Sequence, residues 1–186
     1  MVSYTVSYFY TKYGIKNEIN GLREYDQHMN VLVGMSGIWI NKDHAHLAAS
    51  PDGLVFDNDT KLQNVVEVKC LNILRLYSVD DIINGDCPTC PTAEIKRQCF
   101  FIKDTHYIEK DYYQVQLQLL VTKVFYCDFV LYSAKGPPHI ERIDHDSKLQ
   151  ARIVESKKLF WERVFIPEYF LMRVPRELLP LVIENI

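Results

Sequence analysis

The sequence has no run of about 20 consecutive apolar residues, the length that a helix needs to cross a bilayer. Its first residues also lack the apolar core of a secretory signal. The chain holds five cysteines, and an odd number spread over 186 residues argues against a disulfide framework. We therefore expect an intracellular protein in a reducing compartment, with no membrane as a partner.

An excess of positive charge is also missing, since the formal net charge is -3 at pH 7. Any contact with nucleic acid must then come from local patches, which counts against a protein that only coats DNA. Internal repeats, low-complexity runs and Gly/Ser linkers are absent as well. With 48% hydrophobic and 24% charged residues, the composition is that of a globular protein, and we expect one domain over residues 1–186.

The pattern of apolar residues predicts both helices and strands. Helical spacing predicts a helix over residues 14–29 and another over 147–165, with Asp146 as N-cap and a stripe of Leu149, Ile153, Phe160 and Val164. We expect strands within 31–40, 46–56, 65–70 and 124–133, and a long insertion or partly ordered loop over 71–111. Residues 113–121 remain open, because their alternation favours a strand while Gln and Leu favour a helix.

Two acidic residues and a lysine are the most informative feature of the chain. A turn-rich segment, residues 57–61, separates two strand-like flanks. A hairpin centred between Asp59 and Thr60 would place Asp52 opposite Glu67, with the register shifting by a residue or two if the turn is bulged. Lys69 is two residues beyond Glu67 and so faces the same side of the strand.

Two opposed carboxylates repel each other unless a cation lies between them, and oxygen ligands of this kind suit Mg²⁺, with Mn²⁺ as a substitute. Hydrolysis of a phosphodiester needs such a metal and a group that positions the attacking water, a role that Lys69 can fill. The alternative is that Asp52 caps a turn while Glu67 and Lys69 form a solvated pair on the strand.

These residues resemble the signature of the PD-(D/E)XK nuclease superfamily, with Pro51-Asp52 as its first half and Glu67-Val68-Lys69 as its second. The order and spacing of three longer segments (residues 47–55, 66–70 and 112–116 before 127–130) resemble the YqaJ-like viral recombinase family, which includes the phage lambda exonuclease. The resemblance covers residues 14 to about 168, with 71–111 poorly matched. It implies an α/β (α+β) fold with a restriction-endonuclease-like core, a central mixed β-sheet flanked by helices.

The resemblance also implies roles for individual residues. Asp52, Glu67 and the backbone carbonyl of Val68 would ligate the metal, and Lys69 would orient or activate the water. Gln114 would lie on a helix beside the site, which favours the helical alternative for 113–121. Glu18 matches the acid that the family supplies from an upstream helix, although a helix-dipole role near the N-terminus is an alternative. The thirteen residues before Gly14 contain no arginine, the residue that the phage enzyme uses in this region to bind a 5′-phosphate.

Other motifs carry weaker signals. Cys87 and Cys90 have the spacing of half a zinc site, which Cys70 and Cys99 could complete, and His44 and His46 have alternate spacing suited to a strand. Basic residues among aromatic ones over residues 96–113 suit phosphate contacts and base stacking, or else form a solvated loop over an aromatic core edge.

The hypothesis from sequence is a metal-dependent DNA nuclease, with an exonuclease acting on linear duplex ends in recombination or end processing as the first choice. A catalytically inactive DNA-binding module and an endonuclease of the same superfamily are the alternatives. The expected cofactor is Mg²⁺ and the expected partner is DNA. A homo-oligomer stays open.

Overall fold

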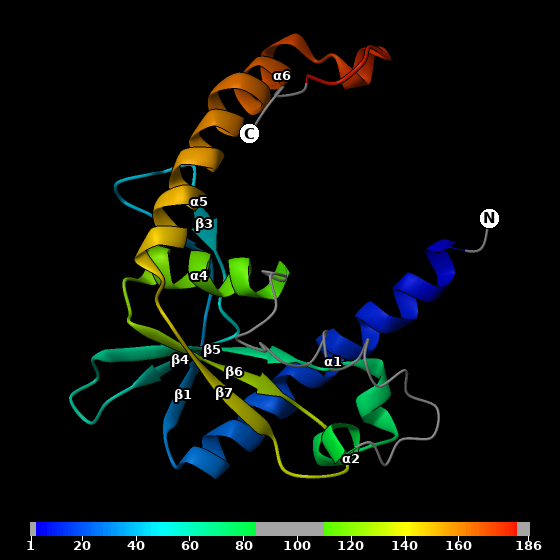
Figure 1. Ribbon diagram of the computed structural model, residues 1–186, viewed down its shortest axis with the longest axis vertical. Coiled ribbons are helices and arrows are strands. Elements are labelled where there is room, and N and C mark those ends of the chain that lie inside the picture. Colours follow the sequence, from blue (N-terminus) through cyan, green and yellow to red (C-terminus); the bar gives the residue numbers. More distant parts are fainter. Residues whose placement is uncertain (1–2, 85–109, 182–186) are drawn as a thin grey trace.

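The computed structural model describes residues 3–84 and 110–181, and its centre is a mixed sheet of five strands in the order β1-β4-β5-β6-β7 (Figure 1). Only the β5–β6 pair is parallel, and the other pairs are antiparallel. The strands are β1 (Leu32–Met35), β4 (Gly53–Phe56), β5 (Leu62–Lys69), β6 (Tyr126–Leu131) and β7 (His139–Asp144). Two short strands, β2 (Trp39–Ile40) and β3 (Ala48–Ala49), form a separate pair.

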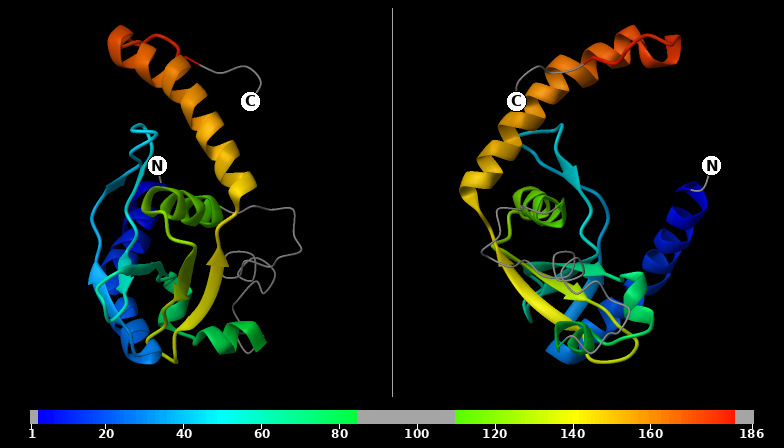
Figure 2. Two further views of the ribbon diagram at one scale, coloured as in Figure 1. Left: turned by 90° about the vertical axis from the view of Figure 1, so that its left-hand side faces the viewer. Right: turned by 45° about the vertical axis from the view of Figure 1, so that its right-hand side comes forward.

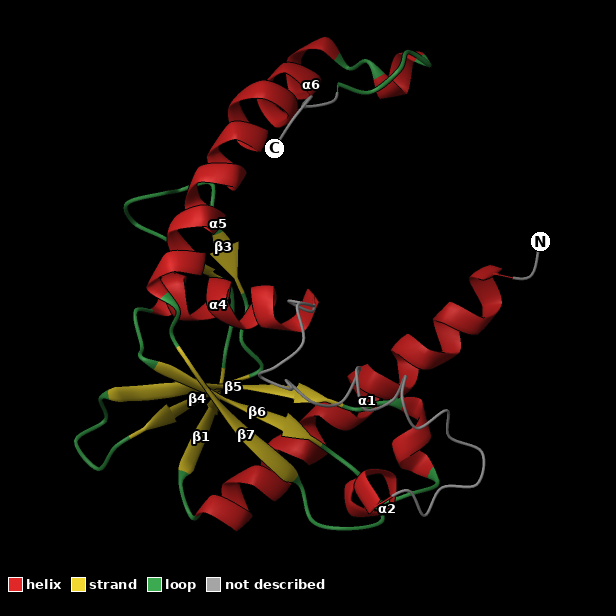
Figure 3. Ribbon diagram, in the orientation of Figure 1, coloured by secondary structure: helices red, strands yellow, loops and turns green. Residues whose placement is uncertain are grey.

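Helices flank this sheet, as Figure 3 shows. The longer ones are α1 (Ser3–Met29), α4 (Lys110–Thr122) and α5 (Ser147–Phe160), and the shorter ones are α2 (Val79–Asn84) and α6 (Ile166–Leu171). In the described residues there are also three single helical turns: η1 (Asn72–Arg75), η2 (Trp161–Phe165) and η3 (Val174–Arg176). The predicted fold class, a mixed sheet flanked by helices, is confirmed.

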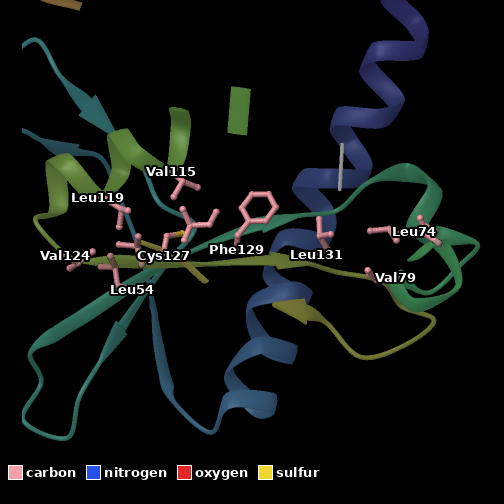
Figure 4. Close-up of a cluster of buried hydrophobic side chains, with 12 residues drawn as sticks. Leu54, Leu74, Val79, Val115, Leu119, Val124, Cys127, Phe129 and Leu131 are labelled. Atoms are coloured by element: carbon pink, nitrogen blue, oxygen red, sulfur yellow. The ribbon is translucent and has the colours of Figure 1, made fainter. Parts of the chain in front are cut away.

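Strand β5 is buried on both of its faces. On one face, Val65 packs with residues of α4, β6 and α2 in the larger core cluster (Figure 4). On the other face, Val66 and Val68 pack with Leu22 and Tyr25 of α1. Because successive side chains of a strand point to opposite faces, Glu67 lies on the same face as Val65 and is covered by α4.

The β4–β5 hairpin has the predicted register next to the acidic residues. Gly53 pairs with Val66, and Val55 pairs with Asn64. A bulge between Val55 and Phe56 shifts the pairing by one residue nearer the turn, where Phe56 pairs with Leu62. Beyond the strand, the amide of Asp52 donates to the carbonyl of Val66 at 3.1 Å, so the chain stays paired up to the predicted site.

The structure bears on two other sequence predictions and contains one strand that the sequence did not predict. The segment left open between strand and helix lies in α4, so the helical alternative is right. The helix predicted over 14–29 ends at Met29 as expected but begins earlier, at Ser3. Strand β7 was not predicted, and its residues form the edge of the sheet beside β6.

The C-terminal arm, defined as residues 161–181, extends away from the sheet in all views (Figures 1 and 2). Asp146 caps α5 as predicted, because its Oδ1 accepts a hydrogen bond from the Leu149 amide at 3.0 Å. Leu149 and Ile153 are buried, but Phe160 is 46% exposed, so the stripe predicted for this helix is wrong in its second half. Beyond its first two turns, the helix has no fully buried residue.

Of the helices in residues 3–84 and 110–181, none is both long and apolar enough to span a membrane.

Candidate active site

Strand β5 places Glu67 and Lys69 on one face, two residues apart, as predicted. Lys69 Nζ lies 2.8 Å from Glu67 Oε1. The side chain of Glu67 is only 3% exposed and that of Lys69 is 25% exposed. The alternative of a solvated strand pair is therefore wrong for Glu67, whose charge is buried and needs partners.

Helix α4 supplies those partners from above the sheet. Gln114 Nε2 donates to Glu67 Oε1 at 2.7 Å, and Gln118 Nε2 donates to Glu67 Oε2 at 2.7 Å. The ammonium of Lys69 also reaches α4, with Gln114 Oε1 at 3.3 Å and Asp111 Oδ1 at 3.3 Å. Burial alone would lower the pKa of Lys69, but the charges of Glu67 and Asp111 outweigh it and raise the pKa above its usual value. Lys69 is accordingly a positively charged residue on the partly exposed side of the site.

Asp52 enters the site from the end of β4. Its Oδ2 accepts a hydrogen bond from the Val68 amide at 2.7 Å, which ties the carboxylate to β5. Burial, and after it the charge of Glu67, raise the pKa of Asp52 to about 7. Two acids thus share one partly buried region, which is the arrangement predicted from the hairpin.

Glu18 approaches from α1. It is half-buried, and its pKa is raised by burial first and by the charge of Glu67 second. The stripe expected beside it is only partly correct, because Ile15 is 65% exposed and Ile19 is 41% exposed. The face of α1 that packs on the sheet instead contains Gly21, Leu22 and Tyr25. Helix α1 begins at Ser3, so Glu18 lies 15 residues beyond its start and far from its first turn. The helix-dipole alternative therefore does not apply to Glu18.

The donor chemistry of these residues fits a hard divalent cation. The carboxylates of Asp52 and Glu67 and the carbonyl of Val68 are oxygen ligands of the type that Mg²⁺ prefers. The pKa of Asp52 is raised first by burial and second by the charge of Glu67, and a bound cation would offset both effects. Within the described ranges, however, no three His, Cys, Asp or Glu side chains are grouped closely enough to hold a metal without adjustment.

The sequence interpretation missed two residues that contact this group, Gln118 and Asp111. Asp111, Gln114 and Gln118 are spaced at i, i+3 and i+7, which is one face of a helix. The spacing would have revealed both residues once 113–121 was taken as helical. Gln116, between them, points elsewhere and bonds to the Asp144 carbonyl and the Asp146 amide, each at 2.8 Å.

Asp128 has a structural environment. It is 1% exposed, accepts from Tyr25 at 2.6 Å, and is paired with Arg142 at 2.9 and 3.1 Å. Asn64 Nδ2 lies 3.4 Å from the same carboxylate. This network ties α1 to β5, β6 and β7, and so fixes the helix that carries Glu18.

The weaker sequence signals lie partly outside the described residues, and Cys70, which lies within them, is near the charges of Glu18 and Asp52. Cys87, Cys90, Cys99 and most of the basic and aromatic segment lie outside the described residues, and Cys70 is a free thiol whose pKa burial raises to about 12. His46 stacks on Trp161 with ring centroids 6.0 Å apart. A pocket of about 300 Å³ lies at the other end of α4, beside His44 and Lys123, and contains none of the predicted site residues.

The comparisons with known proteins agree with this fold. Residues 6–124 match the model of the YqaJ-like viral recombinase domain, and the chain belongs to that family. Its fold is similar to that of an alkaline exonuclease, LHK-Exo, from Laribacter hongkongensis: 24% identity, TM-score 0.61, with 90% of this chain and 75% of that one covered. A structure of LHK-Exo in complex with dAMP is similar at 25% identity and TM-score 0.60, over 89% of this chain and 73% of that one. The core is therefore restriction-endonuclease-like. No curated protein sequence matches the chain.

Proposed function

We propose that this protein is a metal-dependent DNA exonuclease that hydrolyses phosphodiesters at the ends of linear duplexes. Membership of the YqaJ-like family and the likeness to LHK-Exo support DNA exonuclease activity. The observation that carries the proposal is the buried Glu67, held by Lys69 and Gln114 beside the carboxylate of Asp52. Asp52, just before β4, and helix α4 thus meet at one acid of β5.

Each residue of the group has a role in this proposal. Asp52, Glu67 and the Val68 carbonyl would hold Mg²⁺ or Mn²⁺, with Glu18 completing the set from α1. The bound cation supplies charge neutralisation and a more acidic water. Lys69 holds the attacking water, and its ammonium stabilises negative charge on the phosphate. Gln114 holds the side chains of Glu67 and Lys69 in fixed relative positions, since it bonds to both.

The test uses end-labelled linear duplexes, with and without a 5′-phosphate, in Mg²⁺ and in EDTA. We expect digestion from ends in Mg²⁺, none in EDTA, and none of a closed circular duplex. Cleavage of the closed circle would indicate an endonuclease. DNA binding without cleavage in Mg²⁺ or Mn²⁺ would indicate an inactive binding module.

Two substitutions test the assigned residues. Asp52→Asn should abolish hydrolysis, and Lys69→Ala should reduce the rate by about 10²–10³-fold, because removing one group that stabilises charge in the transition state costs that much. DNA binding, measured by fluorescence anisotropy in Ca²⁺, should largely survive Lys69→Ala. Asp57→Asn and Lys61→Ala, in the exposed turn of the same hairpin, are matched controls that should keep full activity. Normal cleavage by the Asp52→Asn protein would end the proposal.

A further inference from the structure

A second glutamine of α4 holds the oxygen of Glu67 that Lys69 and Gln114 leave free. Both of those residues donate to Oε1 of Glu67. Gln118 donates to Oε2 at 2.7 Å, and its side chain is fully buried. The rotamer of the buried acid is therefore fixed from both oxygens, and Gln118 supplies one of the two restraints.

The other end of the same amide has no partner among residues 3–84 and 110–181. Oε1 of Gln118 is buried, and no described group donates to it. Leaving a buried acceptor without a donor costs about 1–3 kcal/mol. Rotating the amide by 180° would not relieve this cost, because Oε1 would then face the carboxylate of Glu67 in place of the donor. Oε1 of Gln118 thus lacks a donor because Glu67 requires the NH₂ group of the same amide.

We propose that Gln118 is a positioning residue of the metal site, with Nε2 orienting Glu67 and Oε1 accepting from the hydration shell of a bound divalent cation. This inference rests on the proposed function. A hydrated Mg²⁺ keeps several of its water molecules when it binds through carboxylates, and these waters are donors. Groups behind metal ligands typically change metal affinity or activity by about 10–100-fold.

Gln116 offers a matched control on the same helix. It is also fully buried, but its amide bonds to the Asp144 carbonyl, the Asp146 amide and Gln150, which join α4 to β7 and α5. A purely structural glutamine would behave like Gln116. Comparing the two separates a loss of packing from a loss of metal binding.

The experiment titrates Mn²⁺ into the full chain without DNA, by calorimetry, for the natural chain and for Gln118→Met and Gln116→Met. Methionine keeps the length of the side chain and the helix propensity but removes both hydrogen-bonding groups. We expect both variants to melt at lower temperature. We expect Gln118→Met to weaken Mn²⁺ binding by about 10–100-fold and Gln116→Met to leave the Kd close to that of the natural chain.

The outcomes distinguish this inference from the proposed function. A natural chain that binds no Mn²⁺ would overturn both. If the natural chain binds Mn²⁺, two outcomes would overturn the role of Gln118 alone. One is a Gln118→Met protein that binds Mn²⁺ as tightly as the natural chain, and the other is a Gln116→Met protein that binds it as weakly as Gln118→Met. Should Gln118→Met not fold, Gln118→Asn takes its place with the same expectation, because its shorter amide cannot span the distance to Glu67.

Discussion

Among the carboxylates of the candidate site, Asp52 has a strongly shifted pKa. Burial and the charge of Glu67 raise its pKa to about 7, well above the value of about 3.9 for an aspartate in an unfolded chain. Asp57, in the turn of the same hairpin, shows the opposite effect. Its pKa is lowered, first by the hydrogen bond from the Lys61 amide. The acid in the site thus opposes folding when charged, and the acid in the turn favours it.

This difference predicts a pH dependence of stability for the metal-free protein. The folded state binds a proton at Asp52 more tightly than the unfolded state, so the stability from this group is lost as pH rises from about 4 to about 7. Asp52→Asn removes the loss while keeping an acceptor for the Val68 amide. In EDTA at pH 8 its melting temperature should exceed that of the natural chain by several degrees, since each kcal/mol is worth about 2–4 °C at this size.

The measurement is a thermal melt by circular dichroism in EDTA at pH 5 and pH 8. Asp57→Asn is the control and should melt lower than the natural chain at pH 8, because its charged form stabilises the turn. An Asp52→Asn protein that is less stable than the natural chain at pH 8 in EDTA would show that the charged Asp52 does not destabilise the folded state.

At the scale of elements, the site depends on how closely α1 approaches β5. A Cβ atom added at Gly21 would lie 2.5 Å from Cγ1 of Val68 and 3.1 Å from Cβ of Tyr132. The helix backbone therefore lies almost directly on the strand. Glu18 is one turn earlier on this helix, so its distance from the other acids is set by this contact.

Gly21→Ala should lower stability by about 1–3 kcal/mol, as overpacking of a core does, despite the better helix propensity of alanine. It should also weaken Mn²⁺ binding, because α1 must move away from β5 and take Glu18 with it. Gly14→Ala on the same helix has nothing within 4 Å of the added atom and should raise stability by up to about 1 kcal/mol. Urea unfolding and Mn²⁺ titration of both variants check this. Equal effects of the two substitutions would contradict it.

The cap of α5 gives a second prediction for an element. Asp146→Ala removes the hydrogen bond to the Leu149 amide and should cost about 0.5–2 kcal/mol. Asp144→Ala leaves its backbone bond to Gln116 in place and should cost less. Urea unfolding of the two variants measures the difference, and a smaller loss for Asp146→Ala would show that the cap is unimportant.

The sequence predicts the β4–β5 hairpin well and α4 poorly, for a physical reason. The Asp- and Asn-rich turn determines the hairpin locally, so the register near Asp52 and Glu67 follows from the chain itself. In α4, polar and apolar residues alternate because the glutamines have buried partners on two sides of the helix. Gln114 and Gln118 bond to Glu67, and Gln116 bonds to the Asp146 amide. Those partners come from distant segments, so the pattern imitates a strand. Strand β7 was missed because most of its residues are polar, and its two isoleucines, Ile140 and Ile143, do not alternate.

At the scale of the whole molecule, the arm differs from the rest of the described chain. None of the residues of η2, α6 and η3 is buried, and Tyr169 and Phe170 are 68% and 76% exposed. A helical period predicts which residues share a face but not whether another element covers that face. This is why the stripe predicted for 147–165 is right at Leu149 and Ile153 and wrong beyond them.

The proposed metal should also act on the whole molecule. A cation that binds only the folded state stabilises it by about 2.7 kcal/mol at a concentration 100 times its Kd. We expect Mg²⁺ or Mn²⁺ to raise the melting temperature of the natural chain at pH 8, and to have little effect on the Asp52→Asn protein. Equal shifts in both proteins would indicate that the cation binds elsewhere.

The burial of β5 on both faces has a consequence for how the protein opens. Residues Asn64–Val68 are all buried, between α4 on one side and α1 on the other. Their amide protons should exchange with solvent only when the entire chain unfolds, at the free energy of that event. Glu67 is in this segment, so we expect partial openings at the periphery to leave the acid in place.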